Sequence, residues 1–111
     1  MATLRSIAPK LSAELECALV EKGRLEVSEQ LQRADVERCT GGDDKDLGYV
    51  YFVRPAPSPH FAKLSAPVAQ TISLYSSHGL NIDIDHDGCL YGIEFIGRPD
   101  IADMLFAAGV L

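Results

Sequence analysis

The segment Asp83–Glu94 constrains the fold of this chain more than any other stretch of the sequence. It reads Asp-Ile-Asp-His-Asp-Gly-Cys-Leu-Tyr-Gly-Ile-Glu and matches each fixed position of the calcium-loop pattern D-x-D-x-D-G-x5-E. In an EF-hand loop, the carboxylates would be the metal ligands, here those of Asp83, Asp85, Asp87 and Glu94. In a β-hairpin, the same residues would form two paired strands and their turn.

An EF-hand requires an amphipathic helix on each side of its loop. The segment before the loop, residues 70–82, contains Gly79 and many β-branched residues. The segment after the loop runs only from Ile93 to Ile96 before Gly97 and Pro99 follow. Neither flank is expected to form a helix, so the sequence favours the hairpin.

Asp87-Gly88 is a strong pattern for a two-residue type I′ turn, which pairs His86 with Cys89. The apolar face of the hairpin is then expected to contain the pairs Ile84–Tyr91, Ile82–Ile93 and Leu80–Phe95. The polar face is expected to contain the pairs Asp85–Leu90, Asp83–Gly92 and Asn81–Glu94.

This register separates the four carboxylates. Glu94 lies about four residues along the ladder from Asp85, roughly 13 Å at ~3.3 Å per residue, and cannot complete a calcium shell. Asp83, Asp85 and Asp87 keep at most a weak attraction for a divalent cation. Their expected role is a solvated strand face, so Asp83→Ala is expected to be nearly neutral.

The N-terminal region predicts helices. Leu11, Leu15 and Leu19 form one apolar stripe within residues 9–22. Residues 24–31 predict a second, short helix, although their apolar positions would also fit a strand.

Residues 33–40 predict a strand that ends at Gly41-Gly42-Asp43-Asp44. Residues 47–53 are apolar and aromatic on both faces, which indicates a central strand or a dimer contact. Three prolines from Pro55 to Pro59 predict an irregular loop. A further strand follows from Val68, then a turn at residues 76–79 in which Gly79 has positive φ, and a closing helix at residues 99–108.

Together these elements predict an α+β fold: an antiparallel sheet of about five strands with an N-terminal helical hairpin and a short C-terminal helix. A chain of 111 residues is expected to be a single domain over residues 1–111. Its parts would be a helical segment (1–32), a sheet core (33–98) and a closing helix (99–111).

Composition narrows the function classes. The net charge is -6 and the sequence pI is about 4.9, and the ten basic residues are scattered, which argues against nucleic-acid binding. No apolar run reaches membrane-spanning length, so no membrane association is expected. Cys17, Cys39 and Cys89 show no metal-site or disulfide spacing and are expected to be reduced thiols in a cytoplasmic protein.

Part of the chain resembles the prokaryotic domain-of-unknown-function family 2283. The resemblance rests on Asp46-Leu-Gly-Tyr-Val-Tyr-Phe52, on Thr71 in a strand, and on Asp83-Ile-Asp-His-Asp-Gly88 followed by Gly92-Ile-Glu-Phe95. It covers about residues 43–98, and the closing motif is its most specific part. The N-terminal helical region, the proline-rich segment and Phe95 depart from the family pattern. The resemblance implies a small α+β sheet domain and an antitoxin-like binding role, and it transfers no catalytic residue.

The sequence leaves catalysis open but favours a non-catalytic protein without a cofactor. His86 and Cys89 would flank an exposed turn, where a pocket and an orienting group are hard to supply. Ser76-Ser77-His78 reads as a turn rather than a triad. Asp83 and Glu94 are expected on the same polar face of the hairpin, at diagonal positions. A solvated polar face is the favoured interpretation over an acid–base pair.

The leading hypothesis is a protein-interaction domain that self-associates or binds a basic protein through an uncovered sheet face. The alternative is a small divalent-metal- or ligand-binding protein, or an enzyme, that uses the acidic segment Asp83–Asp87.

Overall fold

The computed structural model describes residues 2–41, 46–60 and 66–111 of the chain. Its helices are α1 (Leu4–Ile7), α2 (Pro9–Glu21), α3 (Leu25–Arg33), α4 (Tyr75–His78) and α5 (Pro99–Ala107). Its strands are β1 (Val36–Thr40), β2 (Leu47–Phe52), β3 (Val68–Leu74), β4 (Leu80–Asp85) and β5 (Leu90–Ile96). The predicted α+β class, the N-terminal helices and the C-terminal helix are confirmed. The predicted turn residues Gly42, Asp43 and Asp44 lie outside the described ranges.

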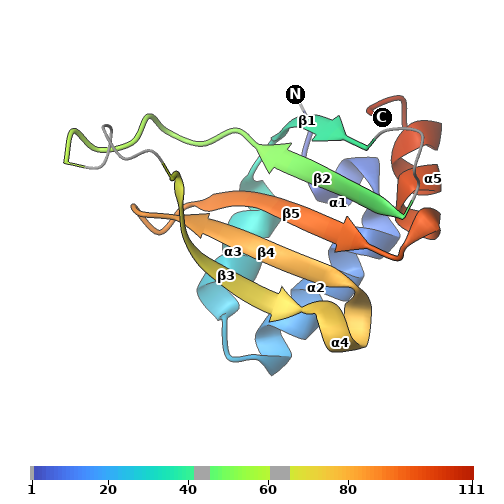
Figure 1. Ribbon diagram of the computed structural model, residues 1–111, viewed down its shortest axis with the longest axis horizontal. Coiled ribbons are helices and arrows are strands. Elements are labelled where there is room, and N and C mark those ends of the chain that lie inside the picture. Colours follow the sequence, from blue (N-terminus) through green and yellow to red (C-terminus); the bar gives the residue numbers. More distant parts are fainter. Residues whose placement is uncertain (1, 42–45, 61–65) are drawn as a thin grey trace.

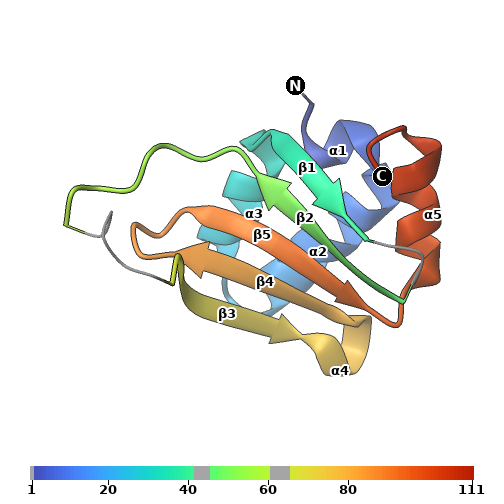
Figure 2. The ribbon, with the colours of Figure 1, turned by 45° about the horizontal axis from the view of Figure 1, so that its top comes forward.

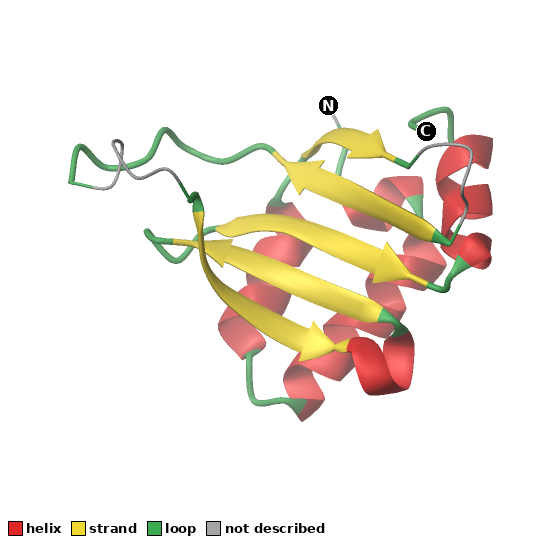
Figure 3. Cartoon of the chain, in the orientation of Figure 1, coloured by secondary structure: helices red, strands yellow, loops and turns green. Residues whose placement is uncertain are grey.

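The five strands form one antiparallel sheet in the order β1-β2-β5-β4-β3. Helices α1, α2 and α3 lie behind this sheet in Figure 1, and α5 lies beside the ends of its strands. Figure 3 shows that no helix of the described ranges covers the front face of the sheet. The described part of the protein therefore has a helix layer on one face of the sheet and no helix on the other, which we call the helix-free face.

The N-terminal helical pair forms where the apolar periodicity predicts it. Pro9 occupies the first turn of α2, and the inward stripe of Leu11, Leu15 and Leu19 is buried. Gly23 follows with a φ of +73°, which lets the chain reverse into α3. Val27 on α3 is buried while Leu25 is 56% exposed, so the strand alternative for residues 24–31 is wrong.

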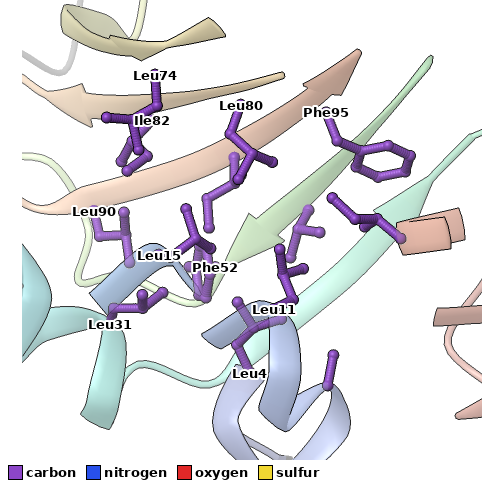
Figure 4. Close-up of a cluster of buried hydrophobic side chains, with 14 of the residues drawn as sticks. Leu4, Leu11, Leu15, Leu31, Phe52, Leu74, Leu80, Ile82, Leu90 and Phe95 are labelled. Atoms are coloured by element: carbon purple, nitrogen blue, oxygen red, sulfur yellow. The ribbon is translucent and has the colours of Figure 1, made fainter. Parts of the chain in front are cut away.

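The core lies between the helix layer and the sheet (Figure 4). The helices contribute Leu4, Leu11, Leu15, Leu19 and Leu31, and the strands contribute Val50, Phe52, Leu80, Ile82, Ile93 and Phe95. Phe95 needs Gly48 opposite it on β2, because a Cβ at Gly48 would overlap the Phe95 ring. Apolar burial of this kind is the main favourable term in the stability of a domain.

The predicted hairpin of β4 and β5 is confirmed over most of its length. Leu80–Phe95, Asn81–Glu94, Ile82–Ile93 and Asp83–Gly92 are paired as expected. The register then shifts, and Ile84 faces Leu90 instead of Tyr91. Tyr91 is therefore the extra residue of a β-bulge and lies on the same face as Gly92.

The predicted type I′ turn is wrong, and so are the pairs His86–Cys89 and Asp85–Leu90. Only Gly88 has a positive φ, +80°, whereas Asp87 does not. The amide of Asp85 donates to the carbonyl of Cys89, and the amide of Gly88 donates to the carbonyl of Asp85. The turn is therefore a three-residue loop that ends in a left-handed glycine, which is the next commonest hairpin solution.

Three further expectations are corrected. The strand predicted over residues 33–40 begins only at Val36, and the turn at residues 76–79 is the one-turn helix α4, capped by Gly79 at a φ of +65°. The aromatic strand β2 is an inner strand of the sheet, between β1 and β5, but it is not covered on both faces within the described chain. Its Val50 and Phe52 face the core, but Tyr49 and Tyr51 point to the helix-free face, so the strand is covered on one side within the chain.

Candidate functional site

Asp83 of the acidic motif is held by hydroxyl groups from two other strands. Thr71 on β3 donates to Oδ1 at 2.6 Å, and Tyr49 on β2 donates to Oδ2 at 2.6 Å. Tyr49 reaches Asp83 across β5 because Gly92 lies between them in the sheet. A Cβ at Gly92 would overlap the Tyr49 ring. Both carboxylate oxygens of Asp83 thus accept hydrogen bonds that link β2, β3 and β4 across the intervening β5.

The Tyr49 phenol is a donor in this contact. Burial, and then the hydrogen bond to Asp83, raise the pKa of the Tyr49 phenol above its ordinary value of 10.0. The phenol therefore remains protonated at neutral pH and keeps donating to the carboxylate. This arrangement holds the Asp83 carboxylate in place and links three strands of the sheet.

Asp85 does not lie on a solvated face, which corrects the prediction. It is only 5% exposed, and its Oδ1 accepts the amides of Asp87 at 2.9 Å and Cys89 at 2.8 Å. Its Oδ2 accepts Nη1 of Arg54 at 3.0 Å. The carboxylate therefore organises the hairpin turn from inside, as short polar side chains commonly do with the backbone that follows them.

Asp87 and Glu94 also have donors within the protein. The Ser58 amide, in the proline-rich loop, donates to Oδ2 of Asp87 at 2.9 Å. Nδ2 of Asn81 donates to Oε1 of Glu94 at 3.1 Å. In residues 2–41, 46–60 and 66–111, no group of three or more His, Cys, Asp or Glu side chains is arranged to hold a metal ion. The four candidate ligands Asp83, Asp85, Asp87 and Glu94 are thus distributed among separate structural contacts.

Gln30 fixes the hairpin turn to the helix layer, a role that the sequence does not indicate. Its Nε2 donates to the carbonyl of Gly88 at 2.9 Å, and its Oε1 accepts the amide of Leu90 at 2.9 Å. One side-chain amide on α3 thus satisfies two backbone groups of the turn. No local pattern marks Gln30 for this role, because the contact spans about sixty residues of sequence.

The structure does not assemble a cysteine–histidine nucleophile from His86 and Cys89. Nε2 of His86 lies 3.1 Å from the carbonyl oxygen of Ala66. Burial, followed by the nearby Asp85 and Asp87 charges, raises the pKa of the Cys89 thiol above its ordinary value of 9.0. Burial also raises the pKa of Cys39 to about 11. Raised values disfavour the thiolate, which is the reactive form of cysteine.

An ion-pair network joins α2 to the segments that follow β3 and β5. Arg98 donates from Nη1 and Nη2 to the two oxygens of Glu14, both at 2.9 Å, and also binds both oxygens of Asp100. Nδ1 of His78 lies 2.8 Å from Oε2 of Glu14. The hydrogen bond from Arg98 is the largest cause that lowers the pKa of Glu14. The network orients His78 beside a pocket of about 250 Å³ that is also lined by Ser76 and Ser77, but no hydrogen bond links either serine to the imidazole.

A tyrosine cluster lies on the helix-free face. The rings of Tyr49 and Tyr51 are 4.5 Å apart, and the Tyr91 ring lies 6.4 Å and 6.1 Å from them. The guanidinium of Arg38 stacks 3.9 Å from the Tyr51 ring, and that of Arg54 lies 4.7 Å from the Tyr91 ring. Tyr91 joins this cluster only through the β-bulge, so the sequence alternation had assigned it to the opposite face. We call these five residues the tyrosine surface.

Comparison with known proteins gives no information about the function of this chain. No protein-family model, no curated protein and no solved structure matches it. None of the helices within the described ranges is both long enough and apolar enough to cross a membrane.

Proposed function

We propose that this chain is a non-catalytic protein-interaction domain, and that the tyrosine surface on its helix-free sheet face binds a protein partner. The observation that carries the proposal is the cluster of three half-buried tyrosines flanked by two arginines on a face that no described helix covers. Tyrosine and arginine are the residue types that are enriched at the energetic centres of protein interfaces.

The side chains of the tyrosine surface are held by contacts within the chain. Tyr49 is fixed by its bond to Asp83, and it packs on Tyr51. The hydroxyls of Tyr51 and Tyr91 have no hydrogen-bond partner within the described part of the chain, so they are free to donate to a ligand. Aromatic side chains that are already ordered lose little conformational entropy on binding, which favours affinity.

The net charge of the whole chain supports a basic partner, since Arg54 of the tyrosine surface is already paired with Asp85. A net charge of -6 attracts a cationic protein and accelerates encounter at low ionic strength. An acidic binding domain that neutralises a basic protein would be an antitoxin-like arrangement, in keeping with the resemblance to family 2283 and with a cytoplasmic location. The alternative of a metal-binding or catalytic acidic segment gains no support, because each of its carboxylates already accepts a hydrogen bond from the protein.

A comparative capture experiment tests the proposal. Three tagged proteins are exposed to the same cell lysate: the wild type, Tyr51→Ala, and Phe106→Ala. Phe106 is a matched control because it is the most exposed large apolar residue of the described chain, at 73%, and lies on α5 away from the tyrosine surface. A partner of the tyrosine surface should be retained by the wild type and by Phe106→Ala and lost from Tyr51→Ala.

The captured partner is then purified and titrated by calorimetry. We expect Tyr51→Ala to weaken binding by at least ~10-fold, as truncation of an interface aromatic typically does, and Phe106→Ala to leave it unchanged. The proposal is wrong if no captured protein depends on Tyr51, or if both variants bind the purified partner as tightly as the wild type. Circular dichroism of both variants confirms that the fold is intact.

A further inference from the structure

The outer edge of β3 has no backbone partner within the described part of the chain. β3 pairs with β4 on one side, and among residues 2–41, 46–60 and 66–111 no other backbone hydrogen bond involves the residues of β3. An edge of this kind presents unpaired amide and carbonyl groups and is a template for another strand. Figure 2 shows β3 as the border of the sheet on the side opposite β1.

In contrast, the opposite edge of the sheet, formed by β1, is protected from pairing with a further strand. The amide of Val36 at the start of β1 donates to the carbonyl of Ala2 at 2.8 Å, and Thr3 forms a bridge with Asp35. β1 also carries the charged residues Glu37 and Arg38. Coverage and charge are the usual means by which proteins prevent edge strands from pairing.

Within the described residues, β3 has neither form of protection along most of its length. Its sequence, Val-Ala-Gln-Thr-Ile-Ser-Leu, contains no charged residue in a chain with a net charge of -6. A bulge between Val68 and Gln70 interrupts the strand near its start and leaves Gln70–Leu74 regular. Two acidic molecules repel each other over most of their surfaces, so a charge-free strand is where two copies can approach without opposing like charges.

Exposed apolar side chains flank this edge. Of the six large hydrophobic residues that are exposed in the described chain, Tyr75 directly follows β3, and Val20 and Leu25 lie on either side of the α2–α3 turn. That turn is linked to β3, because Nη2 of Arg24 donates to Oε1 of Gln70 at 3.3 Å. Apolar surface therefore lies beside the strand in both the sheet layer and the helix layer.

We infer that the chain forms a symmetric dimer in which β3 pairs in antiparallel fashion with β3 of a second copy. A two-fold axis perpendicular to the sheet at Ile72 pairs residues 70–74 of one copy with residues 70–74 of the other. It places Thr71 opposite Ser73 of the second copy. Thr71 already donates its proton to Asp83, so its oxygen accepts the proton of that serine. The two sheets become one ten-stranded sheet whose helix layers, with Val20 and Leu25, also approach each other.

This dimer extends the proposed function without using the same residues. An axis perpendicular to the sheet keeps both helix-free faces on the same side, so the two tyrosine surfaces point in one direction. A partner with two matching sites would then bind both copies with the benefit of high effective concentration. The dimer itself does not depend on the tyrosine surface. An experiment that contradicts the dimer therefore leaves partner binding by the tyrosine surface untouched, and the reverse also holds.

Sedimentation equilibrium of the full chain tests the dimer between about 1 μM and about 1 mM, which spans Kd values typical of weak self-association. The test variant is Ser73→Lys, which places two lysines diagonally across the axis. The matched control is Thr40→Lys, an equal charge change at an exposed position of the opposite edge strand. We expect a species of twice 12.0 kDa for the wild type and for Thr40→Lys, and a dimerisation constant at least ~10-fold weaker for Ser73→Lys.

Hydrogen exchange gives a second readout that does not depend on a variant. Amides of residues 70–74 that point outward should become protected as the wild-type concentration rises, while those of β1 do not change. A wild type that stays monomeric throughout the range overturns the inference. So does a dimer that Ser73→Lys and Thr40→Lys weaken equally. Urea unfolding of both variants verifies that neither loses the monomer fold.

Discussion

The phenol of Tyr49 on β2 donates a 2.6 Å hydrogen bond to the carboxylate of Asp83 on β4, two strands away. The bond passes over Gly92 on β5, and Thr71 on β3 binds the second oxygen of the same carboxylate. One carboxylate on β4 thus binds β2 and β3 and spans the intervening β5. An aspartate that resembles the first ligand of a calcium loop is therefore a structural centre of the sheet.

This contact reverses the expectation for Asp83→Ala. The substitution leaves the half-buried Tyr49 hydroxyl and the Thr71 hydroxyl without their acceptor, and we expect it to lower the free energy of unfolding by ~1–3 kcal/mol. Urea unfolding followed by circular dichroism measures this change. The neighbouring Asp87→Ala is the control, because Asp87 is exposed and accepts one amide, so it should cost less than ~1 kcal/mol. Equal effects of the two substitutions would show that Asp83 is an ordinary surface carboxylate.

Gly92→Ala tests the close approach of the Tyr49 ring. The added Cβ would overlap that ring, so the substitution should cost about 1–3 kcal/mol in the wild type. In a Tyr49→Ala background the overlap disappears, and the additional cost of Gly92→Ala should fall by at least ~1 kcal/mol. A double-mutant cycle from urea unfolding measures this difference.

Gly48→Ala is the matched control for that cycle, because its Cβ would overlap Phe95 on the core side instead. Tyr49→Ala should not relieve the cost of Gly48→Ala. If the two glycine substitutions were rescued alike, the effect of Tyr49→Ala would be a general loosening of the sheet.

Glu14 should contribute to the acid sensitivity of the fold. Its pKa is lowered in the folded protein, chiefly by the hydrogen bond from Arg98, from an ordinary value of 4.5. A depressed carboxyl pKa contributes stability that is present above the unfolded value and is lost as the pH falls through the folded value. We therefore expect this contribution at neutral pH and its progressive loss below about pH 4.5.

The variant Glu14→Gln isolates this contribution. It should lower the free energy of unfolding by about 1–2 kcal/mol at pH 7 and have a smaller effect at acid pH, where the wild-type carboxyl is protonated. Urea midpoints measured across the pH range for both proteins provide the comparison. A difference between the two proteins that does not change with pH would contradict the assignment.

Calcium should not bind the segment Asp83–Glu94 with the affinity of a sensor site. Its carboxylates would have to give up Tyr49, Arg54 and Asn81 as donors before they could converge on an ion. Calorimetric titration of the metal-free protein should therefore show no saturable heat at micromolar calcium. Saturable binding that Asp85→Asn abolishes would restore the calcium-loop interpretation.

Local patterns in the sequence determine much of the fold. The apolar stripe of α2 and the alternation of Leu80, Ile82, Ile93 and Phe95 predict the helix, the strands and most of the hairpin register, because these patterns encode which neighbours share a face. The left-handed Gly79 and Gly88 are also local features, since residue type alone supplies the required φ.

Tertiary structure alone decides how the acidic motif is used and which surface remains free. The bulge at Tyr91 moves a tyrosine from the expected face of the sheet to the opposite one. Strand order brings Tyr49 and Thr71 to Asp83, and folding of the helix layer brings Gln30 to the hairpin turn. These contacts join residues that are far apart in the chain and are set by packing of the whole domain, so no local spacing could specify them.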